Sequence, residues 1–127
     1  LNNDGRLFRT NFPADWKYYT SHHLTYILKN MSLQELIDGF QYLYDKIYDT
    51  GVLRQRFQNA KEVLKDNMNA ALFAFRVNLD WQNVYQHLIQ NLKDLQTTGF
   101  YDEMLKRHSQ AKKQGKIAEL TPLGVSP

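Results

Sequence analysis

The sequence contains no cysteine in its 127 residues. Disulfide frameworks, zinc or iron–sulfur sites held by cysteine, and thiol nucleophiles are therefore excluded within this chain. The lack of cysteine also favours a cytoplasmic protein. The six glycines are scattered and form neither a Gly-x-Gly-x-x-Gly motif nor a Walker-type loop, and no Gly-x-Ser-x-Gly elbow is present. The usual signatures of nucleotide binding and serine hydrolysis are thus missing.

Long apolar segments are also missing. The longest uninterrupted apolar stretch lies near residues 70–75, whereas a membrane-spanning helix needs about 20 apolar residues. The chain does not open with the charged-then-apolar pattern of a signal peptide. We therefore expect neither a membrane span nor a signal peptide, and no membrane partner.

The chain has only a small excess of charge of one sign: its net charge is +3 and its isoelectric point is about 9.1. A nucleic-acid-binding domain usually concentrates more positive charge on one face. The most basic stretch contains Lys106, Arg107, Lys112, Lys113 and Lys116. Positive charge also suits the C-terminal end of a helix, so we interpret this stretch as a solvated helix end and do not expect nucleic acid as a partner.

What the chain does contain is an ordinary globular composition with many aromatic residues. Hydrophobic residues make up 43% and charged residues 23% of the sequence, and 13% are aromatic. Aromatic rings bury large areas in a small core. A chain of this length buries about two-thirds of its unfolded surface without metals or disulfides. The composition predicts a single small soluble domain over residues 1–127.

Residues 1–30 do not have the pattern of a regular helix. Residues 2–5 form a turn cluster, and Pro13 restricts Phe12 to extended geometry. Asp15 is placed to cap a single helical turn that carries Trp16 and Tyr19. We interpret residues 1–30 as an irregular entry segment.

The clearest helix signal begins at Ser32, which forms a capping box with Glu35. Apolar residues then follow at helical spacing and lay one broad stripe along a helix: Leu33, Leu36, Ile37, Phe40, Leu43, Tyr44, Ile47 and Tyr48. Gly39 inside this helix costs about 1 kcal/mol relative to alanine. Gly51 is the expected stop.

Helical spacing resumes over residues 52–65 and again from Met68. The segment after Met68 is apolar on nearly all sides, which predicts the central and most buried helix. Asp80 is a good N-cap, so a fresh helix or a kinked extension is expected from there to Gly99. A last helix should stop near Gly115. The sequence thus predicts an all-α domain of about five helices, with a helical body over 31–116 and a loose tail over 117–127.

The four histidines are not arranged as metal ligands. His22 and His23 are adjacent and point in different directions, whereas helical metal pairs lie three or four residues apart. His87 and His108 fall on different expected helices. We expect no metal site from these residues.

Two acidic pairs, Asp45 with Asp49 and Asp102 with Glu103, are the remaining candidates for acid–base chemistry. Carboxylates on solvated helix faces are common, and nothing in the sequence indicates a cleft that would perturb their pKa values. We therefore assign no catalytic, cofactor-binding or metal-binding residue.

Several short motifs in the first half of the chain resemble a segment of a known family. These are Gly5-Arg6, Asp15-Trp16 with Tyr19 and His23, Met31-Ser32 with Glu35-Leu36 and Gly39, and then Tyr48 and Arg56. Together they resemble the segment after the catalytic barrel in cobalamin-binding radical S-adenosylmethionine proteins, often labelled Fe-S oxidoreductases. The resemblance covers about residues 1–56. The sequence departs from the family pattern at Thr20, at Leu28 and Lys29, and at Asp49, where the family has Asp, a proline and Ser.

The resemblance implies that the whole enzyme would bind a 4Fe-4S cluster through a Cys-x-x-x-Cys-x-x-Cys loop and use S-adenosylmethionine, with cobalamin as a further candidate cofactor. Cluster ligation needs thiolates, and this chain has none. The chain therefore resembles a C-terminal piece of a longer protein, and Leu1 in place of an initiator methionine agrees with this expectation.

The leading hypothesis is a non-catalytic C-terminal helical domain that packs against the catalytic barrel of the same parent chain and shapes substrate access or partner contacts. The candidate interdomain surface consists of Phe12, Trp16, Tyr18 and Tyr19, which we expect to be exposed as an apolar patch. The alternative is a free-standing helical protein-interaction module, with a nucleic-acid binder as its variant.

Overall fold

The structure is a computed structural model that describes residues 4–116. Within that range it contains a short 3₁₀-helix, η1, and four α-helices. Their bounds are η1 Ala14–Tyr18, α1 Leu33–Ile47, α2 Thr50–Val63, α3 Met68–Thr97 and α4 Phe100–Lys113. No strand occurs in these residues, so the all-α prediction is confirmed, whereas the predicted five helices reduce to four α-helices and η1. The tail predicted over 117–127 lies outside the described residues.

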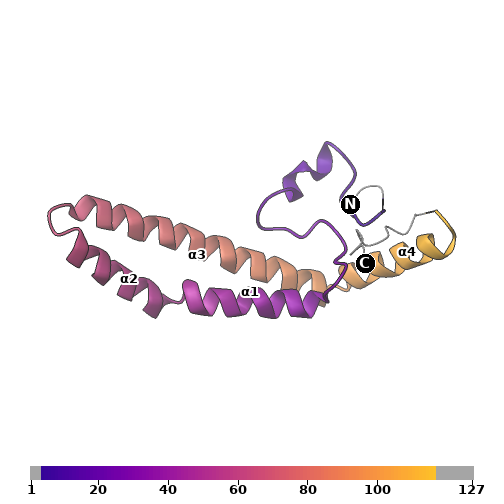
Figure 1. Cartoon of the computed structure of the whole chain (residues 1–127). Coiled ribbons are helices and arrows are strands. Elements are labelled where there is room, and N and C mark those ends of the chain that lie inside the picture. The colour runs from indigo at the N-terminus through magenta and orange to yellow at the C-terminus, as the bar shows by residue number, and fades with distance from the viewer. Residues whose placement is uncertain (1–3, 117–127) are drawn as a thin grey trace, which may run out of the picture.

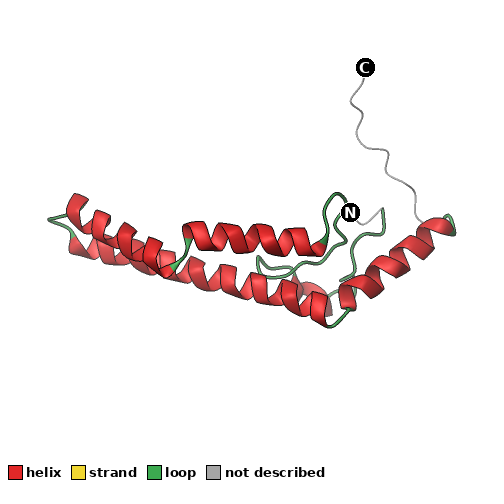
Figure 2. Ribbon diagram, turned by 90° about the horizontal axis from the view of Figure 1, so that it is seen from below, coloured by secondary structure: helices red, strands yellow, loops and turns green. Residues whose placement is uncertain are grey.

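The helices form an elongated layer. Helices α1 and α2 follow each other along one side of α3 and run antiparallel to it (Figure 1). Helix α4 extends beyond the C-terminal end of α3, and the same arrangement is visible from below (Figure 2). Residues 4–32, which we call the N-terminal arm, lie over the junction of α3 and α4. We use "helical layer" for α1, α2 and α3 together.

Helix α1 begins where the sequence predicts it. The Ser32 hydroxyl accepts a hydrogen bond from the Glu35 N–H at 3.1 Å, and the Glu35 carboxylate accepts one from the Ser32 N–H at 2.6 Å. These hydrogen bonds hold the pKa of Glu35 below its usual value. The helix buries Leu33 and Ile37, so the capping box and the apolar stripe are both confirmed.

The boundary between α1 and α2 differs from the prediction. Gly51 does not stop a helix but lies in the first turn of α2. The reason is Asp49, whose carboxylate accepts a hydrogen bond from the Gly51 N–H at 2.7 Å and caps α2. The chain therefore turns two residues earlier, at the cap of the next helix.

Helix α3 corrects two further expectations. It runs without a break through Asp80, because an N-cap residue inside a continuous ladder of hydrogen bonds starts nothing new. It is also not buried all round, since only Ala71, Ile89 and Leu92 are buried along it. The helix ends beside Gly99, whose φ of 68° is the left-handed conformation expected of a glycine stop. Helix α4 ends close to Gly115, as predicted.

The main core lies at the end of the layer where the arm meets the helices. A cluster of buried side chains there consists of Leu24, Leu33, Ile37, Leu92 and Tyr101, drawn from the arm, α1, α3 and α4. At the other end, the buried residues of α2 and of the first turns of α3 are Leu53 and Ala71. Apolar burial is the dominant stabilising term in folding, so the two ends of the layer are unequally stabilised.

Candidate functional site

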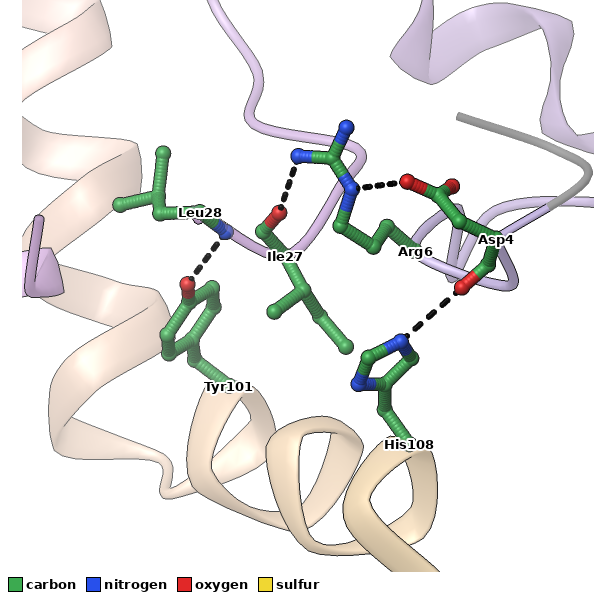
Figure 3. Close-up of polar contacts among 6 residues, drawn as sticks. All are labelled: Asp4, Arg6, Ile27, Leu28, Tyr101 and His108. Atoms are coloured by element: carbon green, nitrogen blue, oxygen red, sulfur yellow. Dashed lines mark hydrogen bonds and ion pairs between the residues drawn. The ribbon is translucent and has the colours of Figure 1, made fainter. Parts of the chain in front are cut away.

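The arm is held to α4 by a set of hydrogen bonds. The Tyr101 hydroxyl accepts one from the Leu28 N–H at 2.8 Å, and the His108 ring lies 3.0 Å from the Asp4 carbonyl oxygen (Figure 3). Arg6 donates to the Asp4 carboxylate at 2.6 Å and to the Ile27 carbonyl at 3.4 Å. These contacts join segments that are up to 104 residues apart, so the arm is a fixed part of the fold.

Two of these groups have altered pKa values. The hydrogen bond from Arg6 lowers the pKa of Asp4. Burial raises the pKa of Tyr101, although the hydrogen bond from Leu28 acts in the opposite direction. Both groups therefore keep their neutral-pH forms, an ionised Asp4 and a protonated Tyr101, over a wide pH range.

Three of the four aromatic residues singled out from the sequence are exposed together on the arm. Phe12, Trp16 and Tyr19 are 47%, 63% and 37% exposed. Their ring centroids lie 5.0 Å apart for Phe12 and Trp16, 5.4 Å for Phe12 and Tyr19, and 6.1 Å for Trp16 and Tyr19. We call these three residues the aromatic surface.

Helix η1 positions the aromatic surface. The Asp15 carboxylate accepts a hydrogen bond from the Asn11 N–H at 2.8 Å, and the Trp16 N–H donates to the Pro13 carbonyl at 3.1 Å. The Tyr19 hydroxyl donates to the Arg9 carbonyl at 2.5 Å. Asp15 thus holds the single helical turn expected there, although it lies inside that turn and not at its N-cap.

Tyr18, the fourth residue, points elsewhere. It is half-buried, and its ring lies 5.5 Å from that of His23 and 4.0 Å from the guanidinium carbon of Arg9. The same guanidinium lies 4.8 Å from the ring centroid of Phe100, the first residue of α4. Arg9 is therefore stacked against two aromatic rings from segments 82 residues apart in sequence.

These residues line a cleft of about 500 Å³ between the arm, the end of α3 and the start of α4. No acceptor within residues 4–116 takes a hydrogen bond from the Arg9 guanidinium, so its N–H groups are available to a molecule in the cleft. Asp94 and Glu103 also line the cleft and supply carboxylates. The cleft thus offers hydrogen-bonding groups of both charges to a small polar molecule.

His23 is the other titratable group in the cleft. Burial lowers its pKa, and the neighbouring His22 and Arg9 lower it further. Its Nδ1 lies 3.0 Å from the Thr20 hydroxyl. A neutral imidazole at physiological pH follows, and the positive charge in the cleft comes from Arg9.

The other residues considered from the sequence have structural contacts. Asp45 accepts a hydrogen bond from Gln41, Asp49 caps α2, and Glu103 pairs with Arg107. The basic residues from Lys106 onward lie exposed along α4 and just after it. These contacts agree with solvated helix faces.

The histidines are distributed over different parts of the fold. His22 and His87 approach with ring centroids 6.2 Å apart, a pair that the sequence did not indicate because 64 residues separate them. His108 contacts the arm instead. Within residues 4–116, no three His, Asp or Glu side chains are grouped so as to hold a metal ion.

Two apolar features of the helical layer were not foreseen. Phe73, Val77 and Trp81, which we call the α3 stripe, are 71%, 37% and 48% exposed. A shallow groove of about 330 Å³ follows α1, and we call it the α1 groove. It is lined by Met31, Glu35, Leu36, Gly39, Phe40 and Leu43. The sequence signal for the stripe is its spacing of four residues, but the same spacing also fits the buried helix that the sequence predicts after Met68.

No family model, curated protein or solved structure matches the chain. Of the helices in residues 4–116, none combines the length and apolar character needed to cross a membrane. The functional assignment therefore depends on the residues of the chain itself and on the resemblance noted in its first half.

Proposed function

We propose that this chain is a non-catalytic C-terminal helical domain of a radical S-adenosylmethionine enzyme, which packs against the catalytic barrel of the same parent chain. The parent would hold the 4Fe-4S cluster, S-adenosylmethionine and, as a further cofactor, cobalamin. Because this chain has no thiolate, cluster ligation would fall to the barrel. The role of the domain would be to shape substrate access or partner contacts.

The observation that supports this proposal is the aromatic surface. Isolated exposed rings are common, whereas three rings in mutual contact at the surface are a typical interaction site. Trp16 is 63% exposed although the arm that carries it is fixed by hydrogen bonds to α4. A rigid exposed aromatic group of this kind is what an interdomain contact uses, because little conformational entropy is lost on docking.

The first test is the coding sequence upstream of Leu1. The proposal requires an in-frame Cys-x-x-x-Cys-x-x-Cys loop there, and an initiator codon directly before Leu1 would contradict it. The second test is hydroxyl-radical labelling of Trp16 in the longest in-frame chain and in the 127-residue chain. We expect strong protection of Trp16 only in the longer chain.

Tyr42 provides the matched control, because it lies on α1 and has the same 63% exposure as Trp16. Its labelling should be equal in both chains. Equal labelling of Trp16 in both chains would show that the aromatic surface is not covered by the parent, and would overturn the proposed docking.

The alternative is a free-standing helical interaction module, with a nucleic-acid binder as its variant, and the α3 stripe is the observation that favours the module. An initiator codon immediately before Leu1 would select it. Binding of a random DNA duplex that falls steeply with salt would be needed for the nucleic-acid variant.

A further inference from the structure

The cleft between the arm, α3 and α4 holds one positive and one negative charge that no other residue in 4–116 neutralises. In this range the Arg9 side chain makes only its contacts with the rings of Tyr18 and Phe100. The Asp94 carboxylate accepts a hydrogen bond at 2.8 Å from Gln90, which is neutral. One oxygen of Asp94 and the N–H groups of Arg9 therefore remain for a bound molecule.

The other acidic and basic side chains of the cleft add no net charge. Glu103 is paired with Arg107, and His23 is neutral because burial lowers its pKa. Arg9 and Asp94 do not pair with each other either, since no ion pair with an N···O distance of 4.0 Å or less joins them. Two opposite charges that line one cleft without meeting suit a ligand that carries both charges itself.

Arg9 is held in place for binding a carboxylate. Its guanidinium carbon lies 4.0 Å from the ring centroid of Tyr18 and 4.8 Å from that of Phe100. A planar guanidinium that stacks on rings keeps its N–H groups for two parallel hydrogen bonds to a carboxylate. Because the ring contacts already restrict the side chain, little conformational entropy is lost when a ligand binds.

The cleft also has an apolar wall. Leu24, from the arm, is buried, and Leu95, from α3, is half-buried and packs against the core cluster that includes Leu24. Both side chains line the cleft, where the arm lies over the junction of α3 and α4 (Figure 1). The cleft volume of about 500 Å³ is within the range of about 300–1,000 Å³ that is usual for small-molecule sites. An aliphatic group of a ligand would thus contact a preformed surface.

We propose that this cleft binds an α-amino acid with an aliphatic side chain. Arg9 binds the carboxylate and Asp94 binds the ammonium group, while Leu24 and Leu95 contact the side chain. The cleft is formed by this chain alone and contains none of the three residues of the aromatic surface. The proposal is therefore independent of the proposed docking to a barrel, and each can fail without the other.

The first test is an NMR titration of the 127-residue chain at neutral pH, with leucine, isocaproate, isoamylamine and glycine as probes. Isocaproate has the carbon skeleton of leucine without the amino group, isoamylamine lacks the carboxylate, and glycine lacks the side chain. We expect leucine to shift the amide signals of residues that line the cleft. Each of the other probes should bind at least about fivefold more weakly, because each loses one of the three contacts.

Two results of this titration would overturn the proposal. One is that leucine leaves the amide signals of the cleft unchanged at every concentration. The other is that isocaproate or isoamylamine binds as tightly as leucine, because the cleft would then recognise only one of the two charges.

The second test assigns the two charged groups of the ligand to Arg9 and Asp94. Arg9→Gln should weaken the binding of leucine and of isocaproate by about fivefold to tenfold, without weakening that of isoamylamine. Asp94→Asn should weaken leucine and isoamylamine by a similar factor without weakening isocaproate. Far-UV circular dichroism checks that both variants keep their helices, and Asp94 is exposed, so its replacement leaves the core intact. Equal weakening of all three probes by Asp94→Asn would show that the assignment is wrong.

The chain offers a matched control for each variant. Asp45, on α1, accepts a hydrogen bond from Gln41 at 3.0 Å with the same spacing of four residues as Asp94 and Gln90, but it lies outside the cleft. Arg54 is an exposed arginine of α2 that also lies outside it. Asp45→Asn and Arg54→Gln should bind leucine like the natural chain. If Asp45→Asn weakens binding as much as Asp94→Asn does, the cleft is not the binding site and the proposal is wrong.

Discussion

Replacing Tyr101 by phenylalanine removes one oxygen atom from the contact between the arm and α4. Tyr101 is only 5% exposed, and its hydroxyl accepts the 2.8 Å hydrogen bond from the Leu28 N–H. Phenylalanine keeps the edge-to-face contact with Phe8, whose ring centroid is 6.4 Å away. The variant therefore isolates the loss of a hydrogen bond and leaves the Leu28 N–H without its acceptor.

We expect Tyr101→Phe to lower the free energy of unfolding by about 1–3 kcal/mol, which is the cost of leaving a partly buried N–H unpaired. Urea unfolding followed by circular dichroism measures this change, and the m-value should stay the same because the exposed area on unfolding is unchanged. Hydrogen exchange of the Leu28 amide should become faster. Tyr42→Phe, at a 63% exposed position, should stay within about 0.5 kcal/mol of the natural chain.

The Tyr101 hydroxyl also makes the stability of the fold depend on pH, with a loss of stability at high pH. Burial raises the pKa of Tyr101 above its ordinary value of 10.0, so the folded state favours the protonated phenol. The resulting stability is present below pH 10 and is lost as the pH rises through the folded-state pKa. The stability difference between the natural chain and Tyr101→Phe should therefore shrink above that pH. If Tyr101→Phe is as stable as Tyr42→Phe at neutral pH, the arm is not held as the structure indicates.

Five further variants test the local structure by urea unfolding. Ser32→Ala should cost about 1 kcal/mol because it removes the cap of α1, and an unchanged midpoint would refute the cap. Gly39→Ala should raise the free energy of unfolding by about 1 kcal/mol, since the added Cβ meets no atom within 4 Å. Gly99→Ala should lower the free energy of unfolding, because Gly99 has a φ of 68°. A change of the same sign in both variants would contradict these predictions. Leu92→Ala should lower the free energy of unfolding by about 2–5 kcal/mol. Val63→Ala, at an 82% exposed position, should change it by less than about 0.5 kcal/mol. Similar losses in both variants would show that Leu92 is not part of the core.

Signals that act within one helical turn were readable from the sequence. The start of α1 follows from Ser32 and Glu35 because a capping box needs only four consecutive residues. The end of α3 follows from Gly99, because glycine adopts the left-handed conformation at no steric cost. Where two local signals compete, the sequence alone misleads. Asp80 has the chemistry of an N-cap, but the continuous hydrogen bonding of α3 makes it an ordinary helical residue.

The surfaces could be predicted only in part. The aromatic surface was foreseen because its three rings lie within eight consecutive residues of an irregular segment. Tyr18 was grouped with them, yet Arg9 and His23 draw it into the cleft. The partner that completes the stack on Arg9 is Phe100, which is close in space but lies on α4, far away in the sequence.

The sequence by itself determined that the chain is helical, where α1 begins and where α3 and α4 end, because capping and left-handed glycine are decided between residues a few positions apart. Only the tertiary structure decided which apolar side chains are buried. Helix α3 has apolar residues on several sides, and the arm, α1, α2 and α4 cover some of them and leave Phe73 and Trp81 exposed. Burial depends on which distant segments pack together, and that information is not contained in the spacing of one helix.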